Sequence, residues 1–450
     1  MQGRRSAAAR RSSLTGSKAL LVVVGLAAGV QIHLVGQISV AELFYVLYTA
    51  YIVACHREYW RIREYATLTK LYGCLLAAQV VSEFMVGNEI GNSLRGIAVT
   101  VMSFCHLTFL VTLFMKDRSL VVWAIAGELL VRIVFPSTFQ GDVGESLSGK
   151  DATFLKFVVA PTLVNILLFV SVIWRVRAMP VVMIYTGMLF VVCGARSMGL
   201  MTFLTGLVSW FFLSGKRVSK KKIARYAVII LVGSYGMYAL YASAVLAGMI
   251  TAGNSVQLLR AKNPYNPVNL LMQGRSEMFI GWIAFMDKPL FGHGAWAEDP
   301  GLKYHMLYDK VHGDTDGKPF DAASFSGLNV IPAHSVIIGY GKYNGIAAFV
   351  IIIAIIYFFL KRGLRLILYS KDRHLVVIAF YFLSICWNSL FSPVSHFRYG
   401  LPICFAFILV SYWEYMIRLR KERRAAEERL AAEHAEESNG GEEKRGGEER

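Results

Sequence analysis

Three polar side chains lie at the ends of long apolar segments or in the polar interval between them: Arg196, Arg275 and His334. An arginine guanidinium is planar, stays charged in a poorly solvated cleft and binds phosphate oxygens in pairs. A histidine titrates near neutral pH, so its ring can take a proton from a hydroxyl group. Two arginines and a histidine gathered at one site could therefore bind a phosphorylated group and activate a nucleophile.

Each of these residues also has a structural interpretation. Arg196 follows an apolar run, and an arginine at a helix end commonly extends its charge to the membrane surface. Arg275 could form a surface ion pair with Glu277. His334 precedes another apolar run, where a lone histidine is more often structural than catalytic. The positions of these three residues in the fold must distinguish the structural interpretation from the functional one.

Three further side chains are weaker candidates for substrate binding. Trp282 could stack on a substrate ring, although aromatic belts at membrane interfaces explain it equally well. His396 and Arg398 could contact an anionic group. A metal site is not predicted in the large loop, because the spacing matches no recognised ligand pattern in the set His293, His305, Asp309, His312 and Asp314.

The composition predicts a polytopic membrane protein. Of 450 residues, 55% are hydrophobic, and the mean hydropathy is +0.48, which is high for a soluble domain. The net charge of +17 is distributed in short basic runs between apolar segments, as the positive-inside rule produces, rather than in one nucleic-acid-binding patch. The six cysteines lie in or beside apolar segments with no Cys-x-x-Cys pair, so we predict neither a disulfide framework nor a metal site.

Cutting the chain at polar residues gives twelve apolar segments long enough, or nearly so, to cross a bilayer. With the basic N-terminus inside, nearly every basic cluster falls on that same side. Merging 180–214 into one span would move Lys216–Lys222 outside, so the segment is divided into two. The predicted spans are 19–36, 38–55, 66–86, 94–115, 119–135, 154–174, 180–195, 197–214, 223–248, 335–360, 374–391 and 399–417.

Twelve spans determine on which side of the membrane each connecting segment lies. Arg196, the turn 392–398 and the large loop emerge on the outer side, and both termini lie inside. The tail is predicted to be a solvated charged helix over 420–435 followed by disordered low-complexity sequence. The expected parts are a basic N-terminus 1–18, nine spans 19–248, the outer loop 249–334, three spans 335–417 and a charged tail 418–450.

Inside the large loop, Asn266-Pro267 is typical of a helix start, with asparagine as the cap and proline in the first turn. We expect one amphipathic helix from there to Lys288, where Pro289 ends it. Its apolar stripe would lie on the membrane surface or on the bundle and hold Arg275 over the end of the bundle.

Taken in order, these motifs resemble the bacterial O-antigen ligase and polysaccharide polymerase superfamily. The shared pattern is a span ending in Gly194-Ala195-Arg196-Ser197, then a long outer loop with Gly274-Arg275-Ser276 and Pro289-Leu290-Phe291-Gly292-His293-Gly294. Next comes His334-Ser335 at the start of a span, followed by a glycine-rich continuation over 339–345. The motifs cover about 194–345, and the predicted layout matches over nearly the whole chain. Relatives commonly carry a tryptophan one turn after the loop arginine, where this chain has Phe279.

The resemblance implies an all-α membrane glycosyltransferase of the bacterial inner membrane, with its active site on the periplasmic face and no metal or cofactor. Its donor would be an undecaprenyl-pyrophosphate-linked glycan. Arg196 and Arg275 would hold the pyrophosphate, and His334 would activate the acceptor hydroxyl for inversion. The acceptor would be another lipid-linked repeat unit, which we favour, or lipid A-core. A chain-length regulator is a further partner in such pathways.

A transporter or flippase is the main alternative of another class. It predicts repeated halves and charged residues at mid-bilayer. The chain has no evident internal repeat, and few ionisable residues lie near the centres of the predicted spans. The exceptions are Glu42, His106, Glu128 and Arg132. A membrane scaffold would explain the spans but not the two arginines and the histidine on one side.

Overall fold

The computed structural model is largely helical. The predicted outer loop 136–153, the basic pair Lys216-Arg217 and much of the loop 249–334 lie outside the residues that it describes. The described residues are 2–34, 36–56, 59, 62–135, 155–174, 176–213, 219–249, 258–259, 263–299, 301–312 and 330–446.

The helices of the bundle precede and follow the large loop in the sequence. Before the large loop come α1 Gln2–Ala27, α2 Val40–Cys55, α3 Arg63–Val86, α4 Ile90–Phe114, α5 Val121–Val134, α7 Ala160–Ile173, α8 Met179–Val192, α9 Arg196–Phe212 and α10 Lys220–Leu246. After it come α15 Val336–Tyr369, α16 Leu375–Phe391, α17 Ser395–Tyr399 and α18 Leu401–Gly446. The short elements are β1 Gln31–Leu34, β2 Gly36–Ser39, η2 Arg118–Leu120, η5 Leu155–Val159, α12 Pro267–Gly274, α13 Ser276–Asp287 and α14 Lys303–His312.

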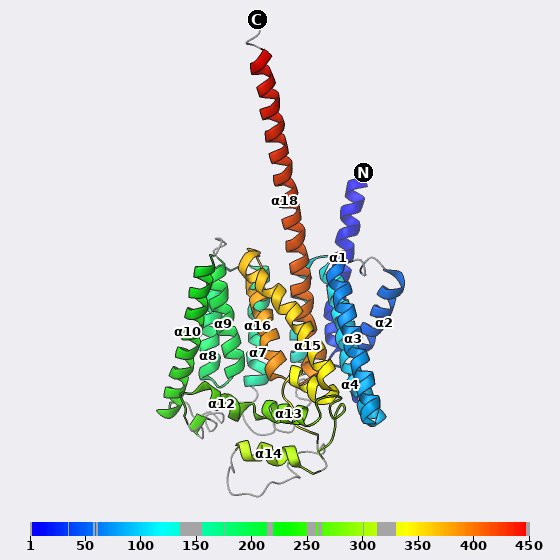
Figure 1. The fold of residues 1–450 in the computed structure, drawn as a ribbon, viewed down its shortest axis with the longest axis vertical. Coiled ribbons are helices and arrows are strands. Elements are labelled where there is room, and N and C mark those ends of the chain that lie inside the picture. The colour runs from blue at the N-terminus through cyan, green and yellow to red at the C-terminus, as the bar shows by residue number, and fades with distance from the viewer. Residues whose placement is uncertain are drawn as a thin grey trace.

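The long helices form one bundle, and the loop helices lie across one end of it. Figure 1 shows α12 and α13 against that end with α14 beyond them, whereas both termini project from the opposite end. In the part of the chain that the structure describes, four helices are long and apolar enough to cross a membrane: Ile90–Phe114, Lys221–Leu246, Val336–Tyr369 and Leu401–Ala432. An all-helical membrane protein is thus consistent with the structure, and the twelve crossings stay a prediction.

Each of the twelve predicted segments contains one helix, and the division of 180–214 into α8 and α9 is confirmed. Gly194, with φ of 94°, lies in the turn between them. The two helices pack without intervening side chains, since a Cβ on Gly187 would be 2.4 Å from the Phe203 nitrogen. Small residues permit such close approach between membrane helices.

The prediction of a first span over 19–36 is wrong after Ala27. The strands β1 Gln31–Leu34 and β2 Gly36–Ser39 pair antiparallel instead, with Ile32 opposite Ile38 and Gly36 at φ of 94°. Polar and apolar residues alternate along Gln31–Leu34, which suits a strand, whereas mean hydropathy over a window cannot detect a period of two. The all-α prediction is therefore corrected: the chain is largely helical but contains this two-stranded hairpin.

The outer-loop and tail predictions are each wrong in one respect. Asn266 caps α12 as expected, since its side chain accepts a hydrogen bond from the Val268 N–H. The expected single helix, however, breaks at Arg275, whose φ of −146° is not helical, and α13 starts at Ser276. At the other end of the chain, α18 continues to Gly446, well beyond the helix predicted to end at Ala435.

The loop is locked into the bundle at a break in α15. Gly345 has φ of 73° and ψ of −166°, a conformation open essentially to glycine alone. The interrupted turn is joined by backbone hydrogen bonds to the turn segment Pro289–Gly294. The Ile346 N–H donates to the Pro289 carbonyl at 2.8 Å, and the His293 N–H donates to the Lys342 carbonyl at 2.8 Å. The Pro-Leu-Phe-Gly motif therefore fixes the loop to the helix that follows His334.

Candidate functional site

Helix α13 lies directly beside the chain that carries His334. A Cβ on Gly281 would be 3.1 Å from the Ala333 Cβ, so the glycine permits this approach. Farther along α13, the rings of Phe285 and Phe349 stack with centroids 5.0 Å apart. Trp282 packs on the same Phe349 ring at 6.0 Å, and 42% of its surface is exposed. These contacts give Trp282 a packing role and leave part of it open to a substrate.

His334 is held at the junction of α15 and α16. The next residue, Ser335, caps α15 by accepting a hydrogen bond from the Ile338 N–H at 3.3 Å. The same hydroxyl donates to the Ser389 carbonyl in α16 at 3.2 Å. His334 itself is half-buried. Its backbone position is therefore set by contacts on both sides.

Arg275 reaches the same end of α16. It lies at the break between α12 and α13, half-buried, and its guanidinium carbon is 5.9 Å from the centre of the Trp387 ring. Trp387 precedes Ser389 by two residues on α16, so one turn of this helix contacts both Arg275 and the cap of α15. The structure thus brings Arg275 and His334 together.

The electrostatics of the site show which other charges are close. Burial, followed by electrostatic interactions with Arg275, His396 and Lys156, lowers the pKa of His334 to about 3. Burial, then Arg275 and Arg132, lowers the pKa of His396 to about 4. Both imidazoles are consequently neutral at neutral pH.

Arg275 itself feels charges of both signs. Burial and the nearby Arg196 lower its pKa, whereas the negative charge of Glu277 raises it. Glu277 therefore interacts electrostatically with Arg275, which is consistent with the structural interpretation of this arginine. Arg196 is the first residue of α9, and its guanidinium carbon lies 5.8 Å from the centre of the Tyr241 ring in α10. The second arginine thus belongs to the same electrostatic neighbourhood.

Lys156 is a site residue that the sequence reasoning missed. It lies in η5, immediately before α7, and its charge acts on His334. A signal was present: Lys156 is the one lysine in the otherwise apolar segment 154–174, and an ionisable residue in such a segment is a functional candidate by default. With Lys156 included, the site places two arginines and a lysine around a neutral histidine.

Arg398 has a different environment from the other candidates. Its guanidinium donates to the Glu42 carboxylate at 2.6 Å, through Nη2 and Oε2, and to the Gln37 carbonyl at 3.0 Å. The same carboxylate accepts from the Ser39 backbone N–H at 2.8 Å at the start of α2. These contacts join α17 to the hairpin and α2, so the described residues already compensate the charge of Arg398. Its substrate-binding role stays a prediction.

The two loop histidines that might have suggested a metal site have protein partners. The Nδ1 atom of His305 is 2.9 Å from the Asp299 carboxylate, which also accepts the Tyr304 N–H at the start of α14. His293 contacts the Ala284 carbonyl at 2.8 Å. Within the described part of the chain, no three His, Cys, Asp or Glu side chains are grouped to hold a metal ion.

No protein-family model matches this chain, and no curated protein matches it either. The chemistry of the site therefore rests on its own residues. Fixed cations next to a neutral imidazole can bind a polyanion such as a pyrophosphate and accept a proton from a hydroxyl beside it.

Proposed function

We propose that this protein is a membrane glycosyltransferase that moves a glycan from an undecaprenyl-pyrophosphate donor to a sugar hydroxyl. The observation that carries the proposal is the convergence of Arg275, Lys156 and His334 at the end of the bundle, with Arg196 nearby. Three cations suit the negative charge that develops on a departing pyrophosphate.

In the proposed reaction, the acceptor hydroxyl oxygen attacks the anomeric carbon from the side opposite the pyrophosphate. The C–O bond to the pyrophosphate breaks, its electrons remain on the leaving group, and the configuration inverts. His334 accepts the hydroxyl proton as the new glycosidic bond forms. Arg275, Arg196 and Lys156 stabilise the leaving pyrophosphate.

The proposal includes the orientation of the chain in a bacterial inner membrane. Twelve crossings would place both termini in the cytoplasm and the loop helices on the periplasmic side. The arrangement in Figure 1 supports this orientation, because α12–α14 lie at the end of the bundle opposite the termini. A lipid-linked donor could then enter from the bilayer while its glycan stays in water.

A reconstituted assay tests the proposal. Purified protein in nanodiscs would receive undecaprenyl-pyrophosphate oligosaccharides, with and without lipid A-core. Longer lipid-linked glycans formed without the core would identify a polymerase, which we favour, and product formed only with the core would identify a ligase. Absence of transfer to either acceptor would refute the enzyme and favour a transporter. Turnover that is unchanged in both Arg275→Ala and His334→Ala would refute the assignment of the reaction to this site.

A further inference from the structure

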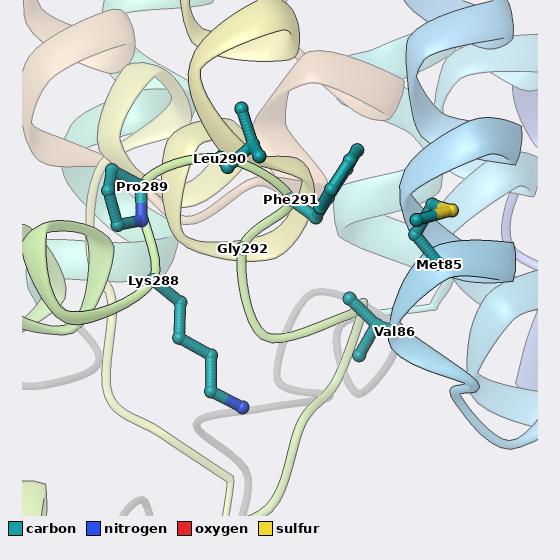
Figure 2. Close-up of a pocket in the computed structure, with 7 residues that line it drawn as sticks. All are labelled: Met85, Val86, Lys288, Pro289, Leu290, Phe291 and Gly292. Atoms are coloured by element: carbon teal, nitrogen blue, oxygen red, sulfur yellow. The ribbon is translucent and has the colours of Figure 1, made fainter.

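A separate hollow lies between α3 and the segment that follows α13. It has a volume of about 360 Å³ and is lined by Met85, Val86 and Lys288–Gly292. Figure 2 shows Met85 and Val86 at the end of α3 facing the segment that carries Leu290 and Phe291. Apart from the Lys288 ammonium, the lining side chains are apolar.

One wall of this hollow continues along an exposed apolar face of α3. Phe84 is 84% exposed, Met85 56% and Val81 54%. On the opposite wall, Leu290 is 63% exposed. Contiguous apolar side chains exposed to this degree mark a surface that another apolar molecule covers, and in a membrane protein lipid is such a molecule.

The hollow has a fixed shape because its far wall is anchored. The Pro289 carbonyl accepts the Ile346 N–H, and the Phe291 carbonyl accepts the Ser82 hydroxyl at 2.5 Å. These two bonds tie the segment to α15 and to α3 itself. A ligand would therefore enter a preformed site and would not have to order the segment.

The one cation at the rim is available to a ligand. The neighbouring carboxylate of Asp287 is engaged by Lys303 at 2.5 Å and by the Tyr304 hydroxyl at 2.7 Å. Among the ion pairs of the described residues, none includes Lys288. The exposed ammonium of Lys288 thus adds a positive charge to the edge of an apolar surface.

We propose that this hollow binds a hydrocarbon chain of an anionic phospholipid from the surrounding bilayer, with the headgroup phosphate at Lys288. The hollow is at the opposite end of α13 from Arg275. Twelve helical residues at a rise of about 1.5 Å each separate the two ends by about 18 Å. The lipid site is therefore distinct from the cationic site and does not depend on its proposed function.

Native mass spectrometry of the full-length protein tests the assignment. The detergent-solubilised protein would be titrated with phosphatidylglycerol or phosphatidylcholine of identical acyl chains. Both lipids carry a phosphate, but the choline ammonium cancels its charge in phosphatidylcholine. One lysine near a net anionic headgroup contributes about 1 kcal/mol, so phosphatidylglycerol should bind about fivefold more tightly. Lys288→Gln should remove this preference, whereas Lys310→Gln, which alters an exposed lysine on α14, should retain it. Leu290→Ser should weaken both lipids.

Three results would overturn the assignment. The first is equal affinity of the wild type for the two lipids, and the second is a preference that survives Lys288→Gln. The third is displacement of phosphatidylglycerol by undecaprenyl phosphate at a lower concentration than phosphatidylglycerol itself requires, which would give the hollow to a polyprenyl lipid. The altered side chains are exposed, so melting temperatures close to that of the wild type would show that the fold is retained.

Discussion

Replacement of Gly345 by alanine should destabilise the protein strongly, because the break in α15 leaves no room for a side chain. A Cβ at this position would be 2.1 Å from the Leu290 carbonyl oxygen and 2.5 Å from its carbon. Both are backbone atoms, so no flexible side chain can move aside. The backbone conformation of Gly345 adds strain for any other residue.

The magnitude follows from two contributions. Strain at such φ and ψ values costs about 1–3 kcal/mol. Relief of the clash would move Leu290 away from α15 and weaken the hydrogen bonds of Ile346, His293 and Gly294 across the break, each worth about 1 kcal/mol. The free energy of unfolding should fall by about 3–6 kcal/mol in total, well above the effect of a typical substitution.

Thermal unfolding in detergent, followed by circular dichroism, measures this effect. The matched control is Gly73→Ala in α3, where a Cβ would meet no atom within 4 Å. That change should leave the melting temperature unchanged or raise it, because alanine favours a helix over glycine by about 1 kcal/mol. If Gly345→Ala melted together with Gly73→Ala, the docking of the loop into α15 would be refuted.

Three further predictions concern the cationic site. Arg275→Ala should lower kcat for glycan transfer about 100-fold. Arg275→Lys should retain only part of the wild-type kcat, because an ammonium cannot bind two phosphate oxygens in the plane as a guanidinium does. Glycan transfer assays measure both variants. Lys156→Gln should raise the pKa of His334, since it removes one positive charge that lowers that pKa, and NMR of the labelled imidazole detects the shift. Stability should fall as pH drops below about 6.5, because the unfolded chain then binds protons that His334 and His396, with pKa values of about 3 and 4, do not bind in the fold. Each histidine contributes up to about 1.4 kcal/mol per pH unit within that window, and Tm measured against pH should flatten in a His334→Gln, His396→Gln double variant.

The sequence predicted the features that depend on local pattern. Apolar length located a helix in every expected segment, and the distribution of basic residues separated α8 from α9. The cap at Asn266 follows from one dipeptide whose chemistry is the same in any fold. These predictions required no knowledge of which segments meet.

The features that the sequence missed depend on contacts between distant segments. Gly345 is one of several glycines in a helical segment, and its special conformation becomes necessary only when Leu290 packs against it. The break at Arg275 has a local signal in Gly274, but an isolated glycine is tolerated inside a helix, so this residue alone did not predict the break. Lys156 lies more than a hundred residues before Arg275, so no local pattern connects the two.

The electrostatics of the site also bear on how a base of such low pKa could work. A general base is most effective when its pKa lies near the working pH, and a value of about 3 makes His334 a weak proton acceptor in the empty site. Besides burial, this low value has an electrostatic cause at neutral pH: the positive charges of Arg275 and Lys156 oppose an imidazolium. A bound pyrophosphate would offset those same cations, so the pKa of His334 should rise when the proposed donor is present. The acceptor hydroxyl would then be activated only beside an occupied donor site, which protects the empty site from side reactions and couples the two substrates through charge alone.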